Sequence, residues 1–208
     1  MAAYEACRDA AEINNQNSRR QQMLVLSTDK ICRKVDELIE TYGTTDLTEL
    51  CDALNIIVTT QDLDTDEDSI KGLVTRIDKF NMICIVLNNN LTEIPRKFYL
   101  AHEIGHAILH INDRNPRITD MGSFDITDKM EIEANLFAAE LLLGDSETLD
   151  EEMRSGEYTM FQFAAEKGVP YELVAYKLDI MRDQGYDVPE LPIPPEARFL
   201  SKVRGVYD

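Results

Sequence analysis

The sequence predicts an α+β fold that is mostly helical, with a small three-stranded sheet and a C-terminal pair of helices similar to a helix-turn-helix. Two observations lead to this fold class. Short runs of β-branched residues gather between residues 56 and 88. Before and after that stretch, apolar residues recur at the spacing of amphipathic helices. Because strands and helices are segregated along the chain, we expect an α+β rather than an α/β arrangement.

The chain has 208 residues, which is enough for one domain with a hydrophobic core. We expect that domain over residues 28–183. Residues 1–27 are polar and lack a clear period, which is typical of a flexible extension. Residues 184–208 contain four of the seven prolines, so they predict an extended tail.

Helices are predicted on both sides of the β-rich stretch. A first helix covers residues 28–43, where apolar side chains share one face and a glycine ends the run. A second, over 45–56, can be capped by Asp46 or Thr45. Further helices are predicted in the second half of the chain, over 93–111, over 128–143, and as a pair broken at Gly168 with Pro170 opening its second member.

Three runs predict the strands: "IIVTT", "IKGLVTRI" and "MICIVLN". The last two are joined by the turn-like "DKFN". The acidic segment "QDLDTDEDS" between the first two lacks the glycine and the closing glutamate of a calcium loop, so we interpret it as a solvated turn. The segment "INDRNPRITDMGSFDIT" is expected to be a long loop between two helices.

Composition and charge exclude several classes of protein. No apolar run is long enough to span a bilayer, and the N-terminus does not resemble a signal peptide, so we expect a cytoplasmic protein without a membrane partner. The net charge of −18 disfavours direct nucleic-acid binding. The C-terminal helical pair offers only Lys177 and Arg182 for DNA contact. The four scattered cysteines are typical of reduced, partly buried thiols.

All three histidines lie within the stretch "AHEIGHAILH". His102, Glu103 and His106 form the pattern H-E-x-x-H. Residues four apart on a helix have Cβ atoms about 5–6 Å apart, so two imidazoles can converge on one ion. In such sites both histidines are metal ligands and the glutamate is the catalytic base. The competing interpretation is a helix with surface histidines and a solvated Glu103.

Helical projection places the histidines on one stripe and the apolar residues on another, which must pack on the core. Tyr99 lies beside the histidines and could assist catalysis, although a tyrosine there more often only packs. His110 continues the stripe. Ligands at i, i+4 and i+8 of one straight helix run along a line, so we expect His110 to flank the site.

A third ligand must then come from another element, since catalytic zinc sites use three protein ligands. The segment "DKMEIEANLFAAELLL" is the best source. Glu131 lies on a helical stripe with Asn135, and Asn135 can orient a ligand through a hydrogen bond. The alternative role for Glu131 is a capping box with Asp128. Glu133 points to the opposite side, with Glu140, and we expect both to be solvated.

The segments "FYLAHEIGHAILH" and "EIEANLFAAELLL" together resemble the ImmA/IrrE family of metallopeptidases. The usual pattern of that family is H-E-x-G-H on one helix, followed by E-x-x-A-N-x-F-A-A-E-L-L on the next. The resemblance extends from about Ile31 to about Leu178. Many members continue "LLMP" where this chain has "LLLGD", a small departure.

The resemblance implies a zincin-like metallopeptidase domain with a gluzincin-like Zn²⁺ site. His102, His106 and Glu131 would be the ligands and Glu103 the catalytic base. It also implies a zinc-dependent endopeptidase whose substrate is a helix-turn-helix repressor, in mobile-element, phage or stress regulation. The run "MICIVLN" is the candidate strand edge for aligning a peptide. The alternatives are a non-proteolytic regulatory binding module or a transcription regulator built on the same fold.

Overall fold

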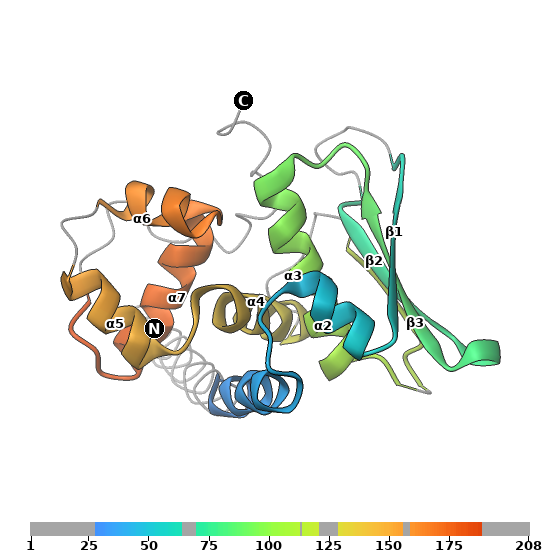
Figure 1. The fold of residues 1–208 in the computed structure, drawn as a ribbon, viewed down its shortest axis with the longest axis horizontal. Helices are drawn as coiled ribbons and strands as arrows, with labels where there is room; N and C mark the ends of the chain where they lie inside the picture. The colour runs from blue at the N-terminus through green and yellow to red at the C-terminus, as the bar shows by residue number, and fades with distance from the viewer. Residues whose placement is uncertain (1–27, 64–69, 113, 121–128, 156–158, 189–208) are drawn as a thin grey trace, which may run out of the picture.

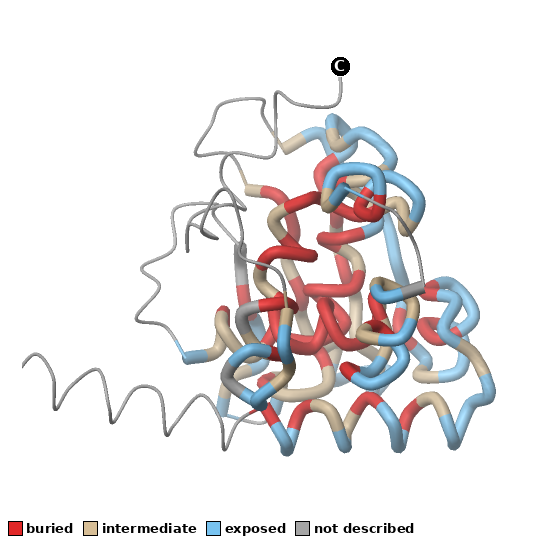
Figure 2. The backbone as a smooth tube through the Cα atoms, turned by 90° about the vertical axis from the view of Figure 1, so that its left-hand side faces the viewer, coloured by how far each residue is buried: buried red, intermediate tan, exposed pale blue. Residues whose placement is uncertain are grey.

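The computed structural model describes residues 28–63, 70–112, 114–120, 129–155 and 159–188. The predicted N-terminal extension and most of the acidic turn and of the proline-rich tail lie outside these residues. In Figure 1 a sheet forms one side of the molecule, and helices form the rest. Figure 2 shows that buried residues gather in the interior, where the helices meet each other and the sheet. The α+β class predicted from the sequence is confirmed.

The sheet has four described strands in the order β1-β3-β2-β4. Strand β1 is Ile56–Gln61, β2 is Gly72–Ile77 and β3 is Met82–Asn88. A short 3-10 turn, Asp78–Phe80, joins β2 to β3, as the "DKFN" turn predicted. β1 pairs with β3 in parallel, whereas β2 and β3 are antiparallel.

The prediction of three strands was incomplete. A fourth strand, β4 (Arg117–Asp120), lies within the segment expected to be a loop, and it pairs antiparallel with β2. It is only four residues long and mixes charged with apolar side chains, so neither periodicity nor composition distinguishes it from a loop. Its buried Ile118 lies opposite Val74 in the register and extends the core under the sheet edge.

Two helices lead into the sheet. Residues 28–42 are helical and end at Gly43, whose φ of 69° is the left-handed conformation that favours glycine. Helix α2 (Leu47–Ala53) begins after Asp46, which accepts hydrogen bonds from two backbone amides of the first turn. The sequence predictions for both helices, including the Asp46 cap, are confirmed.

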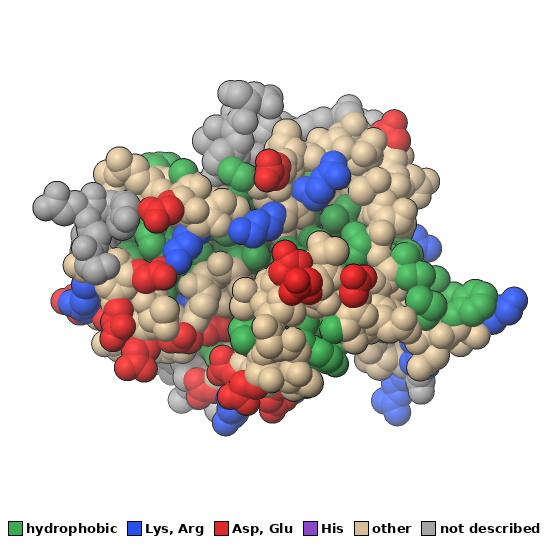
Figure 3. Space-filling model, in the orientation of Figure 1, with side chains coloured by type: hydrophobic (Ala, Val, Ile, Leu, Met, Phe, Trp, Pro, Cys, Tyr) green, Lys and Arg blue, Asp and Glu red, His purple; other side chains and the backbone are tan. Residues whose placement is uncertain are grey.

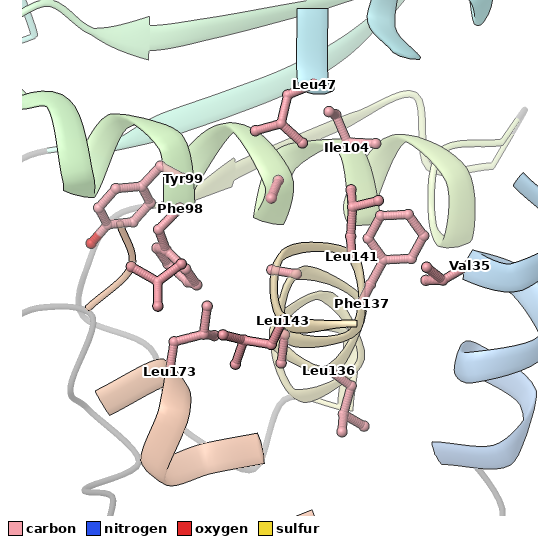
Figure 4. Packing of buried hydrophobic residues seen from close by; sticks show 14 of the residues in the cluster. Val35, Leu47, Phe98, Tyr99, Ile104, Leu136, Phe137, Leu141, Leu143 and Leu173 are labelled. Carbon is pink, nitrogen blue, oxygen red and sulfur yellow. The ribbon is translucent and has the colours of Figure 1, made fainter. Parts of the chain in front are cut away.

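Helices α3 (Glu93–Leu109) and α4 (Lys129–Leu143) form the centre of the molecule, close to their predicted bounds. α3 packs against strands β2 and β3 and also against α4. The two helices approach closely at Gly105, where an added Cβ would lie 3.2 Å from the Phe137 side chain. Figure 4 shows Ile104 of α3 and Phe137 of α4 among the buried side chains of this core.

Three helices complete the fold on the far side of α4 from the sheet (Figure 1). Two helices are present where the pair was predicted, α6 (Met160–Lys167) and α7 (Tyr171–Asp183), separated at Gly168, and their likeness to a helix-turn-helix stays a prediction. Gly168 has a φ of 61° and ends α6. Helix α5 (Ser146–Ser155) was not predicted, because its sequence "SETLDEEMRS" has too few apolar residues to show a helical period.

A buried ion pair joins α4 to α7. Lys177 is fully buried, and its Nζ donates to Glu140, which is 5% exposed. The expectation that Glu140 is solvated was therefore wrong. The burial also means that Lys177, one of the two basic residues considered for DNA contact, does not reach the surface.

Cys32, Cys51 and Cys84 are free thiols, buried or partly buried, as predicted for cysteines in the described residues. Burial raises the pKa of Cys51 to about 11 and, with a contribution from Glu140, that of Cys32 to about 12. Both are therefore neutral, unreactive thiols near pH 7. Among the described helices, none combines the length and the apolar character that a membrane span requires.

Candidate metal centre

Side chains of α3 and α4 converge on one point between the two helices. His102 Nε2 lies 3.2 Å from one carboxylate oxygen of Glu131, and His106 Nε2 lies 3.2 Å from the other. The two Nε2 atoms are 3.0 Å apart. These three residues form a group able to hold a metal ion, with ligand atoms that all lie within 4.8 Å of one another.

This group is buried. His102 and His106 are 0% exposed and Glu131 is 4% exposed, and none of the histidines is visible on the face drawn in Figure 3. The interpretation of the histidines as surface residues with a solvated Glu103 was therefore wrong. The helical projection assigned only one face of α3 to the core. The polar face is buried as well, because α4 supplies it with polar partners.

The outward ring nitrogen of His102 is held by α4. His102 Nδ1 lies 2.9 Å from Asn135 Oδ1, within hydrogen-bonding distance. Because a carbonyl oxygen only accepts, His102 carries its proton on Nδ1 and keeps the Nε2 lone pair directed at Glu131. Asn135 therefore contacts His102 in the way that its spacing from Glu131 predicted.

His110 lies outside the convergence point. Its Nδ1 is 2.9 Å from His106 Nδ1, which is the ring nitrogen on the side away from Glu131. The expectation that His110 flanks the site agrees with this geometry. Its Nε2 lies 3.2 Å from Glu133, whose side chain is 19% exposed. Glu133 is thus half-buried and paired, and the expectation that it is solvated was wrong.

The chemistry of the converging atoms fits a cation. When both imidazoles are neutral with their protons on Nδ1, the Nε2 lone pairs and the Glu131 oxygens are all acceptors within about 3 Å of one another. Such an arrangement is repulsive unless a positive charge lies among them. Two imidazole nitrogens and a carboxylate are also a donor set that suits Zn²⁺.

The protonation states agree with this donor set. Burial lowers the pKa of His106 to about 4, although the neighbouring Glu131 carboxylate opposes the shift. Burial on its own would raise the pKa of Glu131, but the two imidazoles that face its oxygens outweigh this effect and hold that pKa well below its usual range. At neutral pH, His106 is therefore neutral and Glu131 is ionised, which are the forms that bind metal.

Glu103 leaves α3 on a different side and meets the sheet. It is 0% exposed, and its carboxylate packs directly against the backbone of Gly72 at the start of β2. A Cβ at Gly72 would lie 2.9 Å from both Cγ and Cδ of Glu103 and would overlap one of its carboxylate oxygens. This contact was not predicted from the sequence, since it depends on how the helix packs on the strand.

Tyr99, the remaining residue that we considered for catalysis, does not belong to the metal group. Tyr99 is 1% exposed and belongs to the hydrophobic core, where it packs edge-on against Phe98 at a centroid distance of 5.3 Å (Figure 4). This position favours the packing role that we considered for it. Asp128, the alternative partner of Glu131, lies outside the described residues.

Comparison with known proteins agrees with this class of site. A helix carrying H-E-x-x-H and a glutamate from the next helix are the arrangement of a metallopeptidase. The model of a peptidase family, M78, described as the IrrE N-terminal-like domain, matches residues 51–179. The chain therefore belongs to the ImmA/IrrE family of metallopeptidases.

Two relatives extend the likeness over most of the chain. The first is an "uncharacterized immunity region protein 2" of Bacillus phage phi105, 38% identical over 143 residues, which are 69% of this chain and 85% of the relative. The second is the metallopeptidase ImmA of Bacillus subtilis (strain 168), 31% identical over 157 residues, or 75% of this chain and 89% of the relative.

Proposed function

We propose that this protein is a zinc-dependent endopeptidase in which His102, His106 and Glu131 hold the metal and Glu103 is the catalytic base. The observation that carries the proposal is the convergence of two imidazole nitrogens and one carboxylate, all acceptors, at a single buried point. Family membership supports a hydrolytic role for the same residues.

Each residue has a definable task. A bound zinc ion supplies Lewis-acid chemistry, which acidifies water and stabilises negative charge on a carbonyl oxygen. Glu103 accepts a proton from the attacking water and delivers it to the leaving amine. Asn135 would hold the His102 ring so that its Nε2 lone pair is free to bind the metal. The buried setting strengthens all of these electrostatic contacts.

The substrate is proposed to be a protein chain that binds in extended form at a sheet edge. The candidate named from the sequence, "MICIVLN", is β3, which lies between β1 and β2 and has no open edge. That assignment was wrong. Strand β4 is an outer strand of the described sheet, and Asp120 at its end pairs in register with Gly72, the residue that contacts Glu103. A peptide added to β4 would run past the catalytic base.

We infer that the substrate is a helix-turn-helix repressor in a mobile-element, phage or stress system. One relative is named for an immunity region of a phage and another is named a metallopeptidase, which together favour a regulatory cleavage. A cytoplasmic location is part of this proposal, because a repressor acts there. The acidic surface, with a net charge of −18, would attract a basic partner.

The test is a Glu103→Gln variant incubated with a repressor encoded beside the gene for this chain. We expect the variant to keep its zinc and its fold but to lose about 10²–10⁴-fold in cleavage rate, the usual contribution of a general base. Cleavage by the variant at the wild-type rate would contradict the assignment. Retention of repressor binding, with no cleavage by either form, would favour the non-proteolytic binding module instead.

A further inference from the structure

A chain of side-chain contacts runs outward from His106 to the surface. His106 Nδ1 lies 2.9 Å from His110 Nδ1, and His110 Nε2 lies 3.2 Å from one carboxylate oxygen of Glu133. The other oxygen of Glu133 lies 3.4 Å from Nζ of Lys129, whose side chain is 59% exposed. His106 is thus connected through two further side chains to a cation at the surface.

The direction of these hydrogen bonds follows from the carboxylate. An ionised carboxylate only accepts, so a neutral His110 that bonds to Glu133 carries its proton on Nε2. Nδ1 of His110 then has a lone pair and accepts the Nδ1 proton of His106. His106 is left with its lone pair on Nε2, the atom that faces Glu131.

The two histidines of the metal group are therefore held in different ways. Asn135 bonds directly to His102, whereas His106 bonds to a third histidine that itself needs a partner. A neutral imidazole can donate or accept at Nδ1, so His110 alone would leave the tautomer of His106 undecided. The carboxylate of Glu133 removes that ambiguity.

We propose that His110 and Glu133 are positioning residues that hold His106 in the tautomer and ring orientation needed to bind the metal. This inference rests on the proposed function, because it assigns them a task at the same zinc site. Partners of this kind typically change metal affinity by about 10–100-fold when they are removed. Neither residue belongs to the group proposed to hold the metal.

Zinc affinity of the purified chain, measured in competition with a chromophoric chelator, tests the proposal. We expect His110→Ala to bind zinc about 10–100-fold more weakly than the wild type. His110→Asn should recover most of the affinity, because its side-chain carbonyl can accept the same proton from His106. Lys129→Ala is the matched control. It removes only the exposed cation at the outer end of this series of contacts, so it should leave the zinc affinity nearly unchanged.

The tautomers can be observed directly. The chain has only three histidines, all in this cluster, so a ¹⁵N-detected NMR spectrum of the zinc-loaded protein contains six imidazole nitrogens. We expect His106 to carry its proton on Nδ1 and His110 to carry its proton on Nε2. In Glu133→Ala, the His110 signals should shift toward a mixture of the two tautomers. This readout does not depend on peptidase activity or on the folding of the His110 variants.

The outcomes separate this inference from the function on which it rests. A wild-type chain that binds no zinc would overturn both. A wild-type chain that binds zinc, together with a His110→Ala variant of equal affinity, would overturn the positioning role and leave the zinc site intact. A His110 proton found on Nδ1 in the zinc-loaded wild type would likewise contradict the proposed direction of these hydrogen bonds.

Discussion

Gly72 of β2 lies directly against the carboxylate of Glu103 on α3, with no space for even a single carbon between them. An added Cβ at residue 72 would be 2.9 Å from two carbons of the Glu103 side chain. The strand therefore packs against the proposed catalytic base and limits the positions open to its carboxylate. This contact does not involve the three residues proposed to bind the metal.

The first prediction concerns the contact between Gly72 and Glu103. Gly72→Ala should displace the Glu103 carboxylate and reduce the rate of peptide cleavage by about 100-fold, the cost typical of a misplacement of about 1 Å. Zinc affinity should stay close to the wild-type value, because Glu103 is not one of the three proposed ligands. Steady-state kinetics and chelator competition on the same preparation measure both quantities.

A double-mutant cycle supplies the control for Gly72. In the wild-type background, Gly72→Ala should destabilise the fold by roughly 1–3 kcal/mol through overpacking. In a Glu103→Ala background the methyl group has space, so the same change should cost much less. Equal losses in the two backgrounds would show that residue 72 does not act through Glu103.

The second prediction concerns the buried ion pair between α4 and α7. Glu140→Ala leaves Lys177 charged, buried and unpaired, so the free energy of unfolding should fall by about 3–5 kcal/mol. The double variant Glu140→Leu, Lys177→Met should recover most of that loss. Glu37→Ala, which breaks an exposed ion pair, should change stability by less than about 1 kcal/mol. Denaturant unfolding of the four proteins measures these differences, and a Glu140→Ala loss no larger than that of Glu37→Ala would contradict this prediction.

The third prediction is a loss of stability in acid for the metal-free protein. The pKa of His106 is lowered from 6.5 to about 4 in the folded chain, so between these values the unfolded state binds more protons than the folded state. Stability should therefore fall as the pH drops from about 6.5 toward 4. The lowered pKa of Glu131 adds a further loss at the acid end, below the usual glutamate range.

Thermal unfolding midpoints measured from pH 7.5 to 4 test this dependence. A His106→Gln variant should show a flatter curve between pH 6.5 and 5, because it lacks the titrating imidazole. A wild-type curve that is flat or rises on acidification over this interval would contradict a buried, neutral His106.

The central group of residues was predictable because its geometry is local. His102, Glu103 and His106 are fixed relative to one another by helical spacing alone. Glu131 and Asn135 share a face of the following helix for the same reason. The only non-local requirement was that the two helices approach closely, and the small residues at their interface indicated that they would.

The contacts that the sequence did not predict all depend on how distant elements meet. Gly72 touches Glu103 only because β2 lies under α3, and Lys177 reaches Glu140 only because α7 crosses α4. His110, at the C-terminal end of α3, contacts Glu133 near the N-terminal end of α4. The helical projection assigned Glu133 and Glu140 to solvent, because a projection does not contain the neighbouring element.

Strand β4 shows the same limit for a sheet. Its four residues acquire strand character from pairing with β2 rather than from their own composition. The outer position of β4 in the described sheet could not be inferred from the order of strands along the chain. As a result, the peptide-binding edge was predicted at β3, which is a central strand.

The zinc content of the purified chain and of its Glu131→Ala variant tests the proposed metal site most directly. Both proteins are dialysed against metal-free buffer and loaded with one equivalent of zinc before the measurement. We predict about one zinc ion per wild-type chain, and almost none on Glu131→Ala under the same wash. A wild-type chain without zinc, or a Glu131→Ala variant that retains a full equivalent, would contradict a metal site built from His102, His106 and Glu131.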